Sequence, residues 1–219
     1  TWKDETIDTE KASRPFTKKS GRIMFPTSHD ITPGNVDHCM VALGNMLAVG
    51  NEVLIVSKPH LGCIKAICDS FHQYRDNILF RFNIGSADNE VLKFWDQYAP
   101  NFDERLESLK HAYAAGFNTS ISCEPLLDDD DDALVEALLP YVTDAIWFGM
   151  ANSMAGRLKL NGHGDIETMQ QWQRLEEIQG NGFIKALYAR HRDNPQIKWK
   201  DSIKRAVGID SVTESGLDI

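Results

Sequence analysis

The sequence predicts an α/β fold, specifically a partial parallel (β/α) barrel, and three observations support this prediction. Short β-branched or aromatic runs alternate with amphipathic helical stretches, which favours parallel strands with helices outside the sheet. The strand-like runs begin roughly 25 to 40 residues apart, which is the spacing of βα units. Five units are visible, whereas a closed barrel of about 250 residues has eight, so we expect an open or partial barrel.

The chain of 219 residues divides into a polar lead-in, residues 1–21, and one barrel-type domain with C-terminal helices, residues 22–219. The lead-in is mixed in charge and contains Pro15. No internal stretch is rich enough in Pro, Gly or Ser to separate a second domain. The strands are expected at residues 22–25, 52–56, 78–82, 119–123 and 144–148.

Helix start and stop residues place the helices between these strands. Pro33 and Gly34 precede the first helical run and Gly50 ends it, Gly116 ends the third, and Pro140 follows the fourth. The expected helices cover residues 36–49, 61–71, 102–115, 133–139, 166–192 and 200–207.

Composition limits the classes of function. Hydrophobic residues make up 42% of the chain, enough for one substantial core. No apolar run approaches the roughly 20 residues of a membrane span, so a membrane protein is not predicted. The net charge of −9 and the lack of an obvious basic face do not indicate nucleic-acid binding. The acidic run at 128–132 favours a solvated loop ahead of a helix, with a metal site as the minor alternative.

The four cysteines, Cys39, Cys63, Cys68 and Cys123, are scattered and do not suggest a disulfide scaffold. Cys63 and Cys68 lie in one expected helix, about 140° apart around its axis, which makes them poor joint metal ligands. We therefore expect buried free thiols in a reducing, cytoplasmic compartment and no metal site within the chain.

Polar groups follow each of the five expected strands. Sites in parallel βα folds form where loops leave the carboxyl ends of strands, so these groups predict a ligand site. The segments concerned are Pro26–Asp30, Ser57–Pro59, Asn83–Ser86, Glu124–Pro125 and Gly149–Asn152.

Four of these side chains are the candidate binding residues: Ser28, Lys58, Asn83 and Glu124. Lys58 offers a cation and Glu124 a carboxylate, so the set could hold a zwitterion. Lys58 could equally act as a Schiff-base nucleophile, as in barrel aldolases. It could also form a structural salt bridge with Glu124 across the strand ends. The residues alone leave these alternatives open.

A stretch covering about half of the chain, residues 23–127, resembles a known family. The matching runs are Thr27-Ser28, Val56-Ser57-Lys58, Phe80-Arg81-Phe82-Asn83-Ile84, Phe102-Asp103-Glu104-Arg105-Leu106 and Ala114-Ala115-Gly116-Phe117. In order and spacing they are similar to spore photoproduct lyase and related radical S-adenosylmethionine (radical SAM) proteins. The C-terminal part, with Trp147-Phe148-Gly149 and Asn152, looks more like uncharacterised relatives of the lyase.

The resemblance implies a partial (β/α)6 barrel that binds SAM across its strand ends. Ser28 and Lys58 match SAM-contacting residues of the lyase, Asn83 matches a polar SAM contact, and Glu124 lies in a pocket-lining region. The family holds a 4Fe-4S cluster through three cysteines spaced C-x3-C-x2-C, a run that this chain lacks. We therefore expect the first βα unit and the cluster loop to lie upstream of Thr1, so that the chain alone binds no cluster.

The resemblance also has a departure that bears on the reaction. Pro26 stands where the lyase has a hydrogen-donating cysteine, and proline cannot donate a hydrogen atom as a thiol does. Thymine-dimer repair by that route is therefore not expected. The substrate remains unidentified at this level.

Three functions follow as hypotheses. The first is the SAM-contacting portion of a radical SAM enzyme, inactive as this chain alone. The second is a cluster-free lyase or aldolase that uses Lys58, and the third is a non-catalytic SAM-binding module.

If a preceding strand is missing, the Arg22–Phe25 strand is a sheet edge, and we expect either self-association there or cover by the lead-in.

Overall fold

The computed structural model describes residues 6–151 and 154–211, and within them the chain is α/β. Six strands form one sheet in the order β1-β2-β3-β4-β5-β6, and every neighbouring pair is parallel. The strands are β1 (Arg22–Phe25), β2 (Glu52–Ser57), β3 (Ile78–Asn83), β4 (Asn118–Cys123), β5 (Ile146–Phe148) and β6 (Ile197–Trp199).

Ten α-helices and two short 3-10 helices accompany the strands in the described ranges. The α-helices are α1 (Thr9–Ala12), α2 (Val36–Ala48), α3 (Leu61–Phe71), α4 (Asn89–Trp95), α5 (Phe102–Ala114), α6 (Asp131–Leu138), α7 (Met154–Leu160), α8 (Ile166–Ile178), α9 (Asn181–His191) and α10 (Asp201–Val207). The 3-10 helices are η1 (His72–Asn77) and η2 (Leu139–Tyr141).

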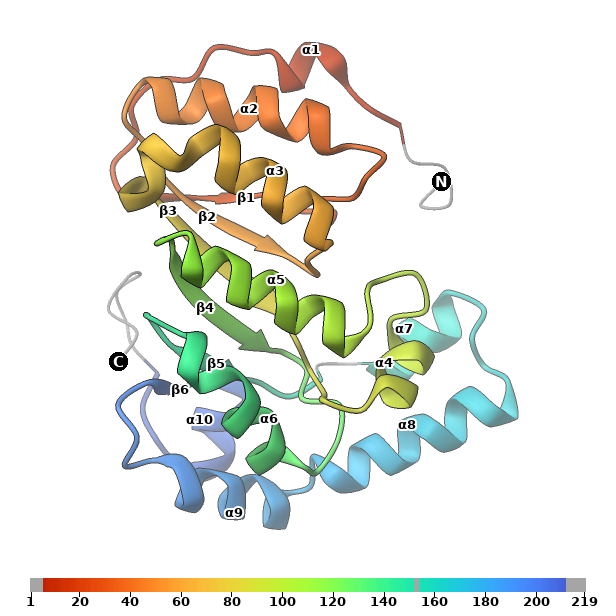
Figure 1. Ribbon diagram of the computed structural model, residues 1–219. Helices are drawn as coiled ribbons and strands as arrows, with labels where there is room; N and C mark the ends of the chain where they lie inside the picture. Colours follow the sequence, from red (N-terminus) through yellow and green to blue (C-terminus); the bar gives the residue numbers. More distant parts are fainter. Residues whose placement is uncertain (1–5, 152–153, 212–219) are drawn as a thin grey trace.

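Each strand pairs with the next strand in the chain, which confirms the predicted α/β class with a parallel sheet. Right-handed crossovers in a sheet of this order place successive helices on the same face. In Figure 1, α3, α5 and α6 lie in front of the strands, and α2 lies above them beside the β1 edge. A doubly wound sheet would instead reverse its strand order and carry helices on both faces. The arrangement is therefore consistent with a partial (β/α) barrel.

Side chains alternate between the two faces of the sheet, and the faces differ in character. One face points toward the helices and carries fully buried residues such as Phe80, Ile121 and Phe148. These residues pack with the helices in one hydrophobic core. Because successive strand residues face opposite ways, Arg81 and Trp147 lie on the other face. A parallel sheet with polar and charged residues on one face is suited to binding on that face.

Strand β1 is an edge of the sheet, because β2 is its one partner within the described residues. Met24 on β1 is 50% exposed. Residues 6–21, the described part of the lead-in, do not extend the sheet. They include α1, which lies over α2 (Figure 1), and the Thr17 carbonyl accepts a hydrogen bond from Asn51. Residues 6–21 thus cover α2 without pairing with β1. Self-association at the Arg22–Phe25 edge stays a prediction.

Several element predictions need correction. Strand β6 was not predicted, because three residues are too few for an alternation pattern. The single helix expected at 166–192 is two helices, which meet at Gly180. A Cβ at Gly180 would lie 2.9 Å from the carbonyl oxygen of Glu177, so this close turn favours glycine. The short helices α1, α4 and α7 were also not predicted.

Within the described parts of the chain, helices long and apolar enough to cross a membrane are absent.

Candidate functional site

A cleft of about 1310 Å³ opens at the carboxyl ends of β1 and β2. It is lined by the loops after β1 and β2, by the end of α4 and the α4–α5 connection, by the lead-in and α2, and by residues of α7, α8 and the loop between them. Among the lining residues are Ser28, Asp30, Lys58, His60, Trp95 and Asp96. Two of the four predicted binding residues, Ser28 and Lys58, thus share one cleft.

Lys58 lies between two carboxylates in this cleft. Its Nζ is 3.6 Å from Oδ2 of Asp30 and 3.7 Å from Oδ1 of Asp96. Both distances exceed those of a good hydrogen bond, so neither carboxylate fixes the ammonium group. Asp30 is oriented by the backbone instead, because its Oδ1 accepts the Lys58 amide at 2.7 Å. The alternative of a Lys58–Glu124 salt bridge is wrong, since the partners of Lys58 are Asp30 and Asp96.

Arg105, on α5, is fully buried and organises this part of the molecule. Its guanidinium binds Oδ2 of Asp96 at 3.0 Å. It also donates to the carbonyl oxygen of Pro100 at 2.7 Å and to that of Asn83 at 3.2 Å. A planar guanidinium can satisfy three groups at once in this way. Arg105 therefore ties the Asp96 side of the cleft to the end of β3.

The other two predicted residues, Asn83 and Glu124, meet at the ends of β3 and β4. The Asn83 side chain donates to the Glu124 backbone carbonyl at 3.1 Å. The Glu124 carboxylate points across Gly149, where an added Cβ would lie 2.9 Å from the Glu124 Cγ, and reaches Lys200 at 3.7 Å. Neither residue lines the Ser28–Lys58 cleft. The structure thus brings the four residues together as two pairs, linked through Arg105. Asn152, from the fifth strand end, lies outside the described residues.

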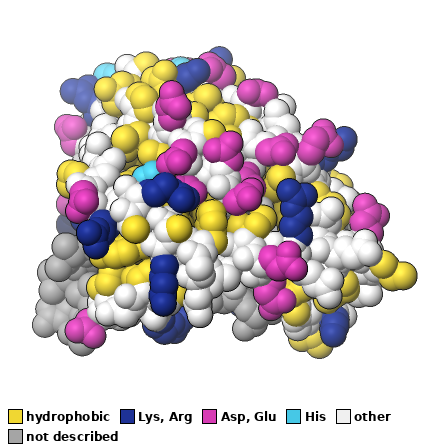
Figure 2. Space-filling view, turned by 90° about the horizontal axis from the view of Figure 1, so that it is seen from below, with side chains coloured by type: hydrophobic (Ala, Val, Ile, Leu, Met, Phe, Trp, Pro, Cys, Tyr) yellow, Lys and Arg dark blue, Asp and Glu magenta, His cyan; other side chains and the backbone are white. Residues whose placement is uncertain are grey.

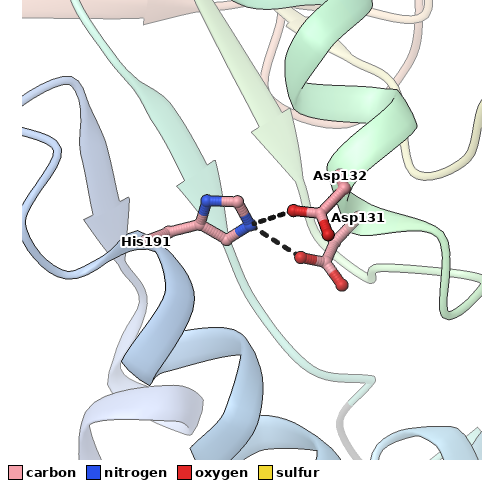
Figure 3. Close-up of side chains that lie close together, drawn as sticks. All are labelled: Asp131, Asp132 and His191. Atoms are coloured by element: carbon pink, nitrogen blue, oxygen red, sulfur yellow. Dashed lines mark hydrogen bonds and ion pairs between the residues drawn. The ribbon is translucent and has the colours of Figure 1, made fainter.

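The acidic run ahead of α6 contains one buried member. Asp129, Asp130 and Asp132 are exposed, as expected for a solvated run, but Asp131 is 1% exposed. His191 lies 2.7 Å from Asp131 and 3.4 Å from Asp132 (Figure 3). These three side chains form the one His/Cys/Asp/Glu group of metal-binding spacing among the described residues.

A protein cation already occupies this group. The Arg190 guanidinium binds both oxygens of Asp131 and lies 3.8 Å from Asp132. Two adjacent residues of α9, Arg190 and His191, therefore hold the first turn of α6. The group joins two helices, and we assign it no metal.

The charge on the surface is mixed. On the face shown in Figure 2, Asp and Glu side chains form a band across the upper part, with Lys and Arg scattered among apolar residues. This face shows no continuous basic surface of the kind that nucleic-acid binding uses.

All four cysteines are buried and lie on different elements or helical faces: Cys39 on α2, Cys63 and Cys68 on α3, and Cys123 on β4. Burial raises the pKa of Cys68 to about 12 and also raises the pKa of Cys63 and of Cys123. Cluster ligands converge on one point, whereas these four thiols lie apart on different elements or helical faces. They do not fit a 4Fe-4S cluster.

The raised pKa of Cys68 predicts a loss of stability in alkali. The unfolded thiol loses its proton near its ordinary pKa of 9.0, whereas the folded thiol keeps it up to about pH 12. The stabilisation is complete below pH 9 and declines above it, by about 1.4 kcal/mol per pH unit for this thiol. Urea unfolding of wild type and Cys68→Ala between pH 8 and pH 10.5 should show a shallower decline for the variant. Equal slopes would contradict the prediction.

Three site residues were not predicted: Asp30, Asp96 and Arg105. Asp30 lies in the first strand-end segment, Pro26–Asp30, where Ser28 was the predicted binding residue. Arg105 carries a pattern that could have found it, since it shares the apolar stripe of α5 with Phe102 and Leu109. A charged residue on the buried face of a helix needs a partner. Asp96 has no comparable pattern, because it follows a short helix that was not predicted.

Comparisons of the chain with protein-family models, with curated proteins and with solved structures found no match. The class supported is therefore an α/β protein with a sequentially ordered parallel sheet, consistent with a partial (β/α) barrel. Within that class, the function rests on the geometry of the cleft.

Proposed function

We propose that this protein binds S-adenosylmethionine in the cleft at the ends of β1 and β2, as the SAM-contacting portion of a radical SAM enzyme. The observation that carries the proposal is Lys58 held between Asp30 and Asp96 in a cleft that also contains Ser28. The resemblance of residues 23–127 to radical SAM proteins adds support, as does the sequential parallel sheet.

The charges in the cleft suit SAM. The methionine part of SAM carries a carboxylate, an ammonium and a sulfonium group. Lys58 offers a cation to the carboxylate, and Asp30 offers an acceptor to the ammonium. Because the ion pairs of Lys58 are long, a ligand carboxylate can compete for its Nζ with little loss. The Ser28 hydroxyl adds a neutral hydrogen bond at the same strand end.

The aromatic and apolar residues of the cleft suit the rest of the ligand. Phe25, Phe94 and Trp95 line it beside the charged groups. Small-molecule sites combine apolar walls with a few well-placed polar groups in this way. Asn83 and Glu124, at the neighbouring strand ends, remain proposed contacts for the part of SAM that extends along the strand ends.

The proposal assigns SAM binding to this chain and no step of reductive cleavage. The described cysteines do not fit the cluster that would supply the electron. A Schiff-base role for Lys58 has less support, because such lysines react as neutral amines, whereas Lys58 lies between two carboxylates. A SAM-binding module without catalysis is compatible with the same cleft.

Calorimetry of SAM binding tests the proposal. Lys58→Ala should weaken binding by about 1.5–3 kcal/mol, roughly 10- to 150-fold in Kd, because it removes a charge-assisted hydrogen bond. Ser28→Ala and Asn83→Ala should weaken it by about 0.5–1.5 kcal/mol each. Lys65→Ala, which removes an exposed lysine from α3, is the matched control and should leave the affinity unchanged. Absence of SAM binding by wild type, or equal affinity of Lys58→Ala and wild type, would refute the proposal.

A further inference from the structure

The sheet face turned away from the helices carries a row of hydrogen-bond donors that have no acceptor. Ser122 on β4 is directly opposite Trp147 on β5, and Trp147 is directly opposite Lys198 on β6. Their neighbours Ile121, Phe148 and Ile197 belong to the hydrophobic core, so these three side chains all point to the opposite face. Register therefore places them side by side.

Each member of this row lacks a partner within residues 6–151 and 154–211. The Trp147 indole N–H is buried and has no acceptor. The hydroxyl of Ser122, a residue 7% exposed, makes no hydrogen bond. The Lys198 ammonium forms no ion pair. Buried donors are almost always paired in folded proteins, so the unpaired indole N–H of Trp147, beside a serine hydroxyl and a lysine without partners, is unusual.

Two further cations flank the indole ring. Arg81 lies over it at 5.1 Å and Lys200 at 5.3 Å from the ring centre. Arg81 is fixed by Ser120 at 3.1 Å and Asp144 at 3.3 Å. Lys200 has one ion pair, at 3.7 Å to Glu124. With Lys198, three cations thus lie near Trp147 against two carboxylates, Asp144 and Glu124, so the local charge is positive in a chain whose net charge is −9.

We infer that Ser122, Trp147 and Lys198 form an oxyanion-binding site on the sheet face turned away from the helices. The ligand is a carboxylate or a phosphate group, because the indole N–H and the ammonium can only donate hydrogen bonds and the Ser122 hydroxyl can donate a third. Its oxygens receive hydrogen bonds from the indole N–H, the Ser122 hydroxyl and the Lys198 ammonium, while Arg81 and Lys200 supply positive potential. The site is separate from the Lys58 cleft and does not depend on SAM binding there.

The five indole N–H groups of the chain make the site testable by two-dimensional nitrogen–proton NMR. The full chain is titrated with inorganic phosphate and, separately, with acetate, against sodium chloride of equal ionic strength. Trp147→Phe identifies the Trp147 resonance by its disappearance. We expect that resonance to shift and saturate with phosphate or acetate, whereas the other four indole resonances do not follow the same saturation curve. The anion that binds more tightly identifies the ligand group.

Variants of the row complete the test. Lys198→Met should raise the Kd of the saturating anion about tenfold, and Ser122→Ala should raise it about threefold. Lys185→Met, which removes an exposed lysine from α9, should leave the curve unchanged. The inference is overturned if the Trp147 resonance does not saturate with either anion, or if Lys198→Met titrates as wild type does while its spectrum remains that of a folded protein.

Discussion

Replacing Arg105 by methionine should lower the free energy of unfolding by about 3–5 kcal/mol, because it breaks a buried ion pair by removing one partner. Arg105 is fully buried, and its guanidinium binds Asp96 and the carbonyl oxygens of Pro100 and Asn83. Methionine fills much of the volume of the side chain but leaves these three acceptors without their donor. Urea-induced unfolding, followed by circular dichroism, measures the loss.

Arg174→Met is the control for Arg105→Met. Arg174 is an exposed residue on α8, and its replacement should change stability by no more than about 0.5 kcal/mol. If SAM binds as proposed, Arg105→Met should also weaken SAM binding, because the replacement removes the link between Asp96 and the end of β3. Equal stability of the two variants would show that Arg105 does not have the organising role that we give it.

Asp131→Asn should be the second large effect, with a loss of about 2–4 kcal/mol. The Asp131 carboxylate is buried and is bound by both Arg190 and His191, which hold α6 against α9. Asparagine keeps the shape of the side chain but removes its charge. The cost lies below that of Arg105→Met because Arg190 is 38% exposed and water can solvate it after the change.

Asp132→Asn provides the matched comparison on the same helix turn. Asp132 is 71% exposed and lies farther than Asp131 from both Arg190 and His191, so its ion pairing is screened by water. Its replacement should cost less than about 0.5 kcal/mol in the same urea experiment. A cost for Asp132→Asn as large as that for Asp131→Asn would contradict the assignment of Asp131 as the buried link.

The two kinds of prediction test different parts of the molecule. Arg105 and Asp131 concern the framework that positions the strand ends and the C-terminal helices. The Lys58 variant tests ligand binding in the cleft, and the variants of the Ser122–Trp147–Lys198 row test anion binding on the sheet face turned away from the helices. A variant that loses SAM affinity but retains full stability locates the function in the cleft and not in the framework.

Most of the fold could be predicted because it depends on local patterns. The first four strands and helices α2, α3 and α5 were predicted within a residue or two, since their apolar spacing and terminal Gly and Pro residues are strong. Strand β6 was not predicted, because Ile197–Trp199 is defined as a strand by its pairing with β5. A three-residue strand has too little periodicity of its own.

The candidate site was predicted only in part, for a reason of the same kind. Parallel strands fix which end of the sheet carries loops, so Ser28, Lys58, Asn83 and Glu124 could be placed at one edge from the sequence. Which of them face one cleft depends on loops and on α4, whose positions follow from long-range packing. Asp96 pairs with Lys58 although the two residues are 38 positions apart in the chain, and no local sequence pattern predicts such a pairing.

The sequence by itself determined the α/β class, the order of the main strands and helices, and the strand ends as the place of a polar site. These predictions rest on local features, namely side-chain periodicity, chain-breaking residues and the direction of parallel strands. The tertiary structure alone decided that Lys58 pairs with Asp30 and Asp96, that Arg105 ties Asp96 to the end of β3, and that Asp131 is buried between α6 and α9. It also decided that Ser122, Trp147 and Lys198 form one row, because register between strands is set by packing of the whole sheet against its helices.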